Sequence, residues 1–244
     1  GLFGNTDCQA TGEPGPEELA LLAPWRGKVP DAVFGPMYVP PRTDGDSSLR
    51  ANLRRARELL RQAGWEVQGG VLRNSKAEAF TLESMDSNES GARVVSPWMR
   101  NLEKLGIQLR FRPVDFALYQ QRLQKFDFEI TSLAYQGTHT PGQEFADLFG
   151  SKAADTEDSG NHAGVKSPAV DDMIRRMTGA RTKAELLPAC RALERIIAHS
   201  HYLIPQWTAG THRIAYNAWR LALPAVSPPY ANSEAWAIDT WWKK

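Results

Sequence analysis

The sequence predicts an α/β fold, because strand-like and helix-like patterns of apolar residues alternate along residues 78–135. The order strand, helix, strand, helix, strand is typical of a layered domain whose strands are joined by right-handed helical crossovers. Composition agrees with a folded domain, since 42% of the 244 residues are hydrophobic and 23% are charged.

The chain opens with an irregular lead-in over residues 1–46. Prolines recur there from Pro14 to Pro41 and rule out long regular elements. Only residues 17–22, which follow Pro16, have the pattern of a short helix.

The first long helix is predicted over residues 48–63, with Ser47 or Ser48 as its N-cap and Gly64 as its C-terminal stop. Its arginines occupy the polar side of an amphipathic helix, which favours a solvated face over a phosphate-binding stripe. The alternating part that follows has predicted strands at 78–85, 108–112 and 126–135 and predicted helices at 94–105 and 115–125.

Two polar stretches, residues 136–141 and 151–167, are the natural places for a binding site. Helices are then predicted at 170–177 and 183–199. Beyond them lies a proline-broken tail that ends in Trp236, Trp241 and Trp242. Because each such ring buries a large area, we expect part of this tail to cover a partner domain or to line a cleft.

Charge and hydropathy argue against nucleic-acid binding and against a membrane-spanning segment. The net charge of +1, with the basic residues scattered among 28 acidic ones, predicts no nucleic-acid partner. No apolar run approaches the roughly 20 residues that a membrane span needs. The chain starts without Met or a signal-peptide pattern, so either a signal has been removed or the chain is a piece of something longer.

The sequence lacks Gly-x-Ser-x-Gly, a Gly-rich phosphate loop ending in Lys-Ser or Lys-Thr, His-Glu-x-x-His and paired Cys-x-x-Cys motifs, and we expect no enzyme activity, no cofactor and no metal site. His199 and His201 lie two residues apart, a spacing that does not place both on one helix face. Cys8 and Cys190 are too few for a zinc site or a disulfide framework, and they are either two structural thiols or one disulfide.

Several short segments together resemble the peptide-type extracellular solute-binding proteins of ABC importers (family 5), nearest to the branch for microcin-C-like peptides and oligopeptides. The likeness rests on the order of these segments: 16–22, 52–56, 59–65, 105–107, 114–115, 119–122, 126–129, 149–151, Asn161 with Gly164, 167–171, 204–207 and 238–242. It covers nearly the whole chain but only about the C-terminal half of such a protein.

The resemblance implies a periplasmic-binding-protein-like fold (type II, peptide-binding subclass). The chain would supply the C-terminal lobe over residues 47–203 and, over 204–244, a hinge and return segment that packs on the missing N-terminal lobe of the same protein. Family members hold a ligand between the lobes and deliver it to an inner-membrane ABC permease. We therefore expect a periplasmic protein of a Gram-negative cell that binds a peptide-like small ligand.

The expected site follows the third predicted strand. The residues predicted to bind ligand are Tyr135, Gln136, Thr138, His139, Thr140, Asn161, His162 and Trp207. Many relatives place an acidic residue in this loop for the amino terminus of a peptide, whereas here no acid occurs before Glu144. That difference favours a capped, modified or non-peptide ligand.

Two other functions are weighed against solute binding. A lobe that has lost its ligand and serves as an interaction or sensory module would also lack the carboxylate. A hydrolase would need Ser132 or Ser159 activated by His139 or His162, and nothing in the sequence marks either serine as activated.

Overall fold

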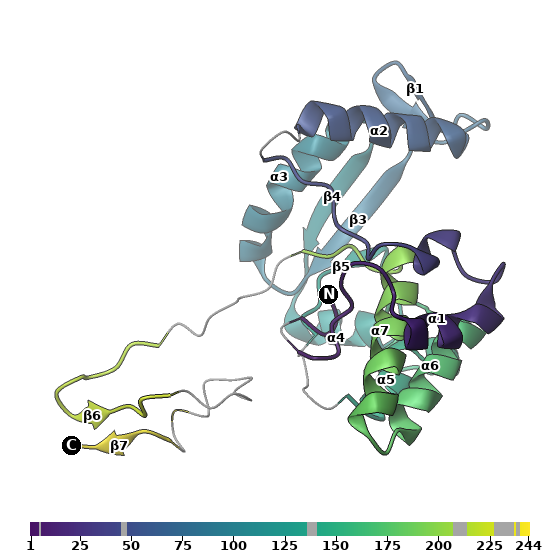
Figure 1. Cartoon of the computed structure of the whole chain (residues 1–244). Coiled ribbons are helices and arrows are strands. Elements are labelled where there is room, and N and C mark those ends of the chain that lie inside the picture. The colour runs from purple at the N-terminus through teal and green to yellow at the C-terminus, as the bar shows by residue number, and fades with distance from the viewer. Residues whose placement is uncertain (5, 45–47, 136–140, 207–213, 227–236, 238–239) are drawn as a thin grey trace. The chain divides into compact units, whose positions relative to one another are not determined.

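The computed structural model describes all residues except 5, 45–47, 136–140, 207–213, 227–236 and 238–239 (Figure 1). The chain divides into two compact units. The first comprises residues 1–38, 135–151 and 163–244, and the second comprises 39–134 and 152–162. The sequence predicts three consecutive parts, 1–46, 47–203 and 204–244. In the structure, the N-terminal residues pack on the helix at 183–199 and belong to the same unit as that helix. The predicted boundaries at 46 and 203 stay a prediction for the whole protein.

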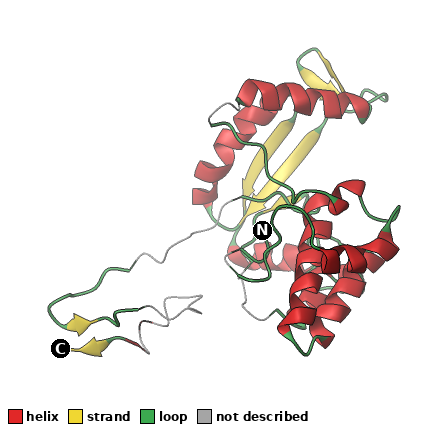
Figure 2. Ribbon diagram, viewed as in Figure 1, coloured by secondary structure: helices red, strands yellow, loops and turns green. Residues whose placement is uncertain are grey.

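The second unit contains a parallel sheet with helices on both faces, and a separate β-hairpin (Figure 2). Its elements are α2 (Leu49–Gln62), β1 (Glu66–Gln68), β2 (Val71–Arg73), β3 (Thr81–Asp86), η3 (Glu89–Gly91), α3 (Ala92–Glu103), β4 (Gln108–Pro113), α4 (Phe116–Gln124), β5 (Ile130–Thr131) and η4 (Ala153–Asp155).

The three parallel strands stand in the order β4-β3-β5. Leu82 of β3 lies opposite Leu109 of β4, and this face packs with side chains of α2 and α3. Met85 of β3 points to the other face, where it packs with Tyr119 and Leu123 of α4. Because successive residues of a strand alternate between faces, the two small clusters form two separate layers on one thin sheet.

Local sequence signals explain most of these elements. Ser48 caps α2 by accepting a bond from the Ala51 amide (3.1 Å), and Asp115 caps α4 through the Leu118 amide (3.0 Å). Gly106 follows α3 with φ +79°, and a Cβ there would stand 2.6 Å from the Leu72 amide nitrogen. Only glycine satisfies both the left-handed backbone and this close approach.

β5 is the main departure from the predicted strands. The sequence predicts a strand over 126–135, but the structure has only Ile130–Thr131. Phe126 adopts φ +54° in the turn that ends α4, where its amide bonds to the Leu123 carbonyl (3.0 Å). An apolar run therefore begins as a helix-terminating turn and becomes a strand four residues later.

The first unit is mainly helical. Its elements are α1 (Pro16–Leu22), η1 (Ala23–Trp25), η2 (Asp31–Phe34), α5 (Glu144–Phe149), α6 (Pro168–Gly179), α7 (Lys183–His199), β6 (Leu221–Ala222) and β7 (Trp242–Lys243). α7 packs against both α1 and α6 (Figure 1). None of the helices in the described ranges is long and apolar enough to cross a bilayer.

A buried charge network ties the N-terminal residues to α7. Arg195 of α7 is fully buried and pairs with Glu18 of α1 through a 2.6 Å bond. Its guanidinium also donates to the carbonyls of Thr11, Gly12 and Gly35 at 3.0–3.1 Å. A buried guanidinium needs such partners, because an unpaired charge in a core is strongly unfavourable.

The C-terminal strands form a short antiparallel pair, with Ala222 opposite Trp242. The Tyr216 and Trp241 rings meet edge to face at 5.0 Å beside it. Trp219 is 90% exposed and Trp242 is 53% exposed. Large aromatic side chains with this much exposure mark a surface that another protein segment can cover.

Candidate functional site

The connections between the parallel strands define the best place for a ligand. From β3 the chain passes through α3 to β4 on one side, and then through α4 to β5 on the other side of β3. The strand order therefore reverses between β3 and β5. Open parallel sheets bind ligands outside the carboxyl ends of their strands at such a reversal, because the two outgoing loops diverge there and leave room.

Asp86 is the last residue of β3 and lies at this edge. One of its carboxylate oxygens accepts a bond from the Asn88 amide at 2.9 Å. The other oxygen lies against Gly91, where any Cβ would collide with it. Glycine at 91 thus lets the carboxylate stay close to the start of α3. The sequence prediction places the site after the third strand and does not include Asp86, which ends the first of the three parallel strands.

Thr131 ends β5 at the same edge. Its hydroxyl and the Tyr119 hydroxyl of α4 lie 3.0 Å apart and form a hydrogen bond. Thr131 is also the register partner of Met85 on β3, next to Asp86. The edge thus combines a carboxylate, hydroxyls and the start of a loop, which are groups suited to recognising amines and amides.

Three of the predicted ligand-binding residues belong to the described part of the chain. Tyr135 is in the first unit, where its ring packs at 5.7 Å from the Phe149 ring. Burial raises the pKa of the Tyr135 phenol, so the hydroxyl stays protonated at neutral pH. Gln136, Thr138, His139, Thr140 and Trp207 lie outside the described residues.

Asn161 and His162 are in the second unit, on the loop that follows η4. Asn161 has no exposed surface. The His162 ring lies 6.3 Å from the rings of both Phe126 and Phe128. Nearby, the Ser159 hydroxyl donates to the Ala153 carbonyl at 2.6 Å, and the Asp158 amide bonds to the Gln124 carbonyl at 2.9 Å. These bonds fix the loop on its own unit.

Basic residues also gather on the α4 face of the sheet, around a depression of about 400 Å³. Arg122 of α4 lies between Glu83 of β3 (3.3 Å) and Asp127 (3.0 Å). Arg112 of β4 also pairs with Glu83, at 3.1 Å. Because carboxylates already balance these guanidinium groups, this depression is not suited to capturing an anion.

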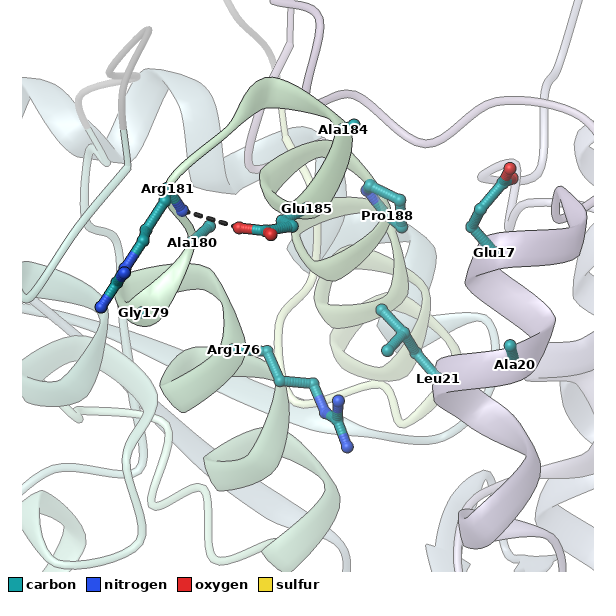
Figure 3. Close-up of a pocket in the computed structure, with 10 residues that line it drawn as sticks. All are labelled: Glu17, Ala20, Leu21, Arg176, Gly179, Ala180, Arg181, Ala184, Glu185 and Pro188. Atoms are coloured by element: carbon teal, nitrogen blue, oxygen red, sulfur yellow. Dashed lines mark hydrogen bonds between the residues drawn. The ribbon is translucent and has the colours of Figure 1, made fainter.

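A depression of about 710 Å³ in the first unit lies between α1 and the ends of α6 and α7 (Figure 3). Apolar atoms of Leu21, Ala184 and Pro188 form much of its wall, while the Glu185 carboxylate accepts a bond from the Arg181 amide at 2.8 Å. No strand end contributes to it. Its charged side chains are Glu17, Arg176, Arg181 and Glu185, and it lacks the strand reversal that favours a ligand site at the edge of the sheet.

Comparison with known proteins identifies the relatives of the chain. The model for bacterial extracellular solute-binding proteins, family 5 (middle region), matches residues 26–157, which is more than half of the chain. The probable peptide-binding protein YejA of Agrobacterium fabrum is 34% identical over 243 residues, covering 99% of this chain and 39% of the relative. YejA of Escherichia coli K12 is 32% identical, covering 98% of this chain and 39% of the relative.

A third relative, the peptidoglycan-binding protein YepA of Agrobacterium fabrum, is 29% identical and covers 92% of this chain. The chain spans only 36–39% of the length of these three curated relatives. All three are therefore considerably longer proteins.

Solved structures agree on the fold. The periplasmic oligopeptide-binding protein of Thermotoga maritima, bound to mannohexaose, matches with a TM-score of 0.62 at 18% identity, covering 100% of this chain and 49% of that chain. AppA of Bacillus subtilis, in complex with a nonapeptide, matches at 0.55 with 16% identity, covering 76% of this chain and 38% of that one. The expected family and the type II binding-protein fold are confirmed.

Proposed function

Because the chain belongs to the bacterial extracellular solute-binding proteins of family 5, we propose that it is the C-terminal part of a periplasmic receptor for oligopeptides or modified peptides. The receptor hands its ligand to an inner-membrane ABC permease and catalyses no reaction. The curated name of the Agrobacterium relative, a probable peptide-binding protein, supports this ligand class.

The observation that carries the proposal is the strand reversal at the carboxyl edge of the sheet, with Asp86 at the end of β3. In the proposed site Asp86 receives the ammonium group of a ligand. The residues that the sequence predicts to bind ligand, Tyr135, Gln136, Thr138, His139, Thr140, Asn161, His162 and Trp207, stay proposed ligand contacts, each to be tested separately from Asp86. A charge-assisted bond between ammonium and carboxylate is about twice as strong as a neutral hydrogen bond, and it orients the ligand.

A non-catalytic role agrees with the hydrogen bonds around Ser159. Its hydroxyl is buried and donates to a backbone carbonyl. A nucleophilic serine instead needs a base positioned to accept its proton. Solute binding does not require Ser159 to act as a nucleophile.

The exposed aromatic surface of the tail supports the proposed place of this chain in a longer protein. Trp219 and Trp242 carry large apolar areas for which the first lobe, supplied by the additional length of the relatives, is the natural partner. In that arrangement residues 204–244 form the hinge and return segment, and lobe closure presents the bound ligand to the permease.

The proposal is tested by calorimetric titration of the full-length parent protein with defined tripeptides and pentapeptides. Each peptide is prepared with a free and with an acetylated amino terminus. Asp86→Asn should weaken binding of the free-amine peptides by about 10- to 100-fold and leave acetylated peptides unchanged. Asp44→Asn is the control, because Asp44 is an exposed carboxylate paired only with Arg42 among the described residues.

Two outcomes contradict the proposal in different ways. Equal loss of both peptide forms in Asp86→Asn means that Asp86 supports the fold and does not contact the amine. No binding of any peptide, together with native mass spectra that show no ligand carried from the periplasm, favours the interaction or sensory lobe. The complete burial of Asn161 supports the interaction or sensory lobe.

A further inference from the structure

Cys8 and Cys190 lie side by side in the core of the first unit, although they are 182 positions apart. Their sulfur atoms are 3.0 Å apart, and the two residues are 1% and 0% exposed. Cys8 belongs to the N-terminal segment, and Cys190 stands near the middle of α7. A disulfide bond is about 2.05 Å long, so the two sulfur atoms need to approach by only about 1 Å.

Backbone contacts hold both cysteines in place. Before and after Cys8, the Glu194 carboxylate accepts bonds from the Phe3 amide (3.2 Å) and the Ala10 amide (2.6 Å). Arg191, the residue after Cys190, donates to the Asp7 carbonyl at 2.9 Å. The same helical turns that carry Cys190 therefore fix the segment that carries Cys8, and the pairing of the two sulfur atoms is not a chance contact of mobile ends.

We propose that Cys8 and Cys190 form an intramolecular disulfide in the oxidising compartment outside the cytoplasm. The bond would join the N-terminal segment covalently to α7. The location rests on the proposed function, whereas the pairing itself rests on the geometry of the two thiols. Proteins that act outside the cytoplasm form disulfides readily, because no reducing thiol pool keeps their cysteines reduced.

The two thiols have different electrostatic surroundings, which suggests the order of the reaction. The hydrogen bond with Cys190 and then the charge of Arg191 lower the pKa of Cys8, against the effect of burial. The pKa of Cys190 is raised, first by its hydrogen bond with Cys8 and then by burial. Cys8 is therefore the first thiol to ionise, and a thiolate is the attacking species in thiol–disulfide exchange.

The oxidant is an external disulfide, either of a thiol–disulfide oxidoreductase or of oxidised glutathione. The Cys8 thiolate attacks it, forms a mixed disulfide and releases one thiol. The Cys190 sulfur, after losing its proton, then attacks the Cys8 sulfur and displaces the second thiol. Two electrons pass from the protein to the external disulfide, and the two protons end on the released thiols. Because both sulfur atoms are buried, the exchange takes place during folding or local opening.

The test uses the 244-residue chain and counts its thiols. Protein unfolded with reductant is refolded with oxidised glutathione, denatured again and alkylated with N-ethylmaleimide. We expect no alkylated cysteine, an intact mass lower than that of the reduced chain by two hydrogens, and two alkylated cysteines after reduction. The melting temperature of the oxidised chain should exceed that of the reduced chain by about 5–15 °C, because the bond closes a very long loop.

A Cys8→Ser, Cys190→Ser double variant is the control, and its melting temperature should not respond to oxidant or reductant. The proposal is overturned if the refolded chain keeps two alkylatable thiols, or if oxidation lowers its melting temperature. A second arm traps the full-length parent with N-ethylmaleimide in intact cells. A disulfide in the refolding arm with free thiols in cells would support the pairing and contradict the periplasmic location, so the two claims fail separately.

Discussion

The two units of the chain bury their side chains in different ways. Among the described residues of the first unit, 19 buried hydrophobic residues form one cluster around α6 and α7, and Glu18, Glu194 and Arg195 are buried charges of the same unit. In the second unit, the sheet separates two clusters that contain three buried hydrophobic residues each. α2 of that unit has no buried residue at all.

This difference suggests that one unit provides stability and the other provides the adjustable ligand contacts. A large core with a satisfied polar network opens only at high free energy, whereas a thin sheet with partly exposed helices opens more easily. Binding loops belong to the less stable parts of proteins because they have to adjust to a ligand. The proposed contact at Asp86 lies in the thinner unit, and the first unit supplies the stable part of the chain.

Removing the charge of Arg195 should have the largest effect on the stability of the first unit. Arg195→Met leaves the Glu18 carboxylate buried without its partner and takes the guanidinium donor from the carbonyls of Thr11 and Gly35. We expect a loss of about 3–5 kcal/mol in the free energy of unfolding, measured by urea titration. Arg42→Met, which removes an exposed ion pair, should cost about 0.5 kcal/mol or less. Similar losses in both variants would mean that the buried network does not stabilise the first unit.

Leucine truncations in α7 and α2 test the difference in burial between the two units. Leu193 of α7 is fully buried, and Leu193→Ala should cost about 3–5 kcal/mol because it leaves a cavity. Leu60 of α2 is only partly buried, and Leu60→Ala should cost about 1–2 kcal/mol because solvent already reaches the site. Hydrogen exchange of the two helices should show the same order. A larger loss for Leu60→Ala would show that the α/β unit limits the stability of the chain.

The smallest effect concerns pH and His199, at the end of α7. Burial lowers the pKa of His199, although its ring also contacts the Pro36 carbonyl at 3.1 Å. The folded state therefore binds this proton less readily than the unfolded chain. The stability tied to neutral His199 is present above about pH 6.5 and is lost as the pH falls through the lower folded pKa.

The melting temperature of the wild type should accordingly fall slightly more between pH 7 and pH 5 than that of His199→Gln, by an amount on the order of 1 °C. Differential scanning calorimetry of both proteins at the two pH values measures this difference. An equal or larger fall in the variant would show that His199 does not titrate during unfolding in this range.

Much of the fold follows from local sequence signals. The helix ends at Ser48, Gly64, Asp115 and Gly106 were predictable because caps and stops act within a few residues. The β1–β2 hairpin was missed, although Gly69-Gly70 between two short apolar runs is a recognisable turn signal. α5 was missed because a six-residue helix gives little periodicity, even though Phe145 and Phe149 are buried.

The site was harder to predict than the fold. The resemblance to a family directed attention to the loop after the third strand and to Asn161 and His162. Asp86 could not be assigned in the same way, because its place at the edge of the sheet depends on strand order, a long-range property. Once β5 is known to lie beside β3, the last residue of each of these two strands is the first place to search.

The way α7 holds the N-terminal segment bears on how this part of the protein can evolve. Glu194 and Arg195 bind Phe3, Ala10 and Thr11 through main-chain amides and carbonyls, groups that are the same whichever side chains are present. The identity of exposed residues in this segment, such as Thr11 and Glu13, can therefore change while the path of the segment is kept. In laboratory evolution, a library randomised at those positions should retain a high fraction of folded members.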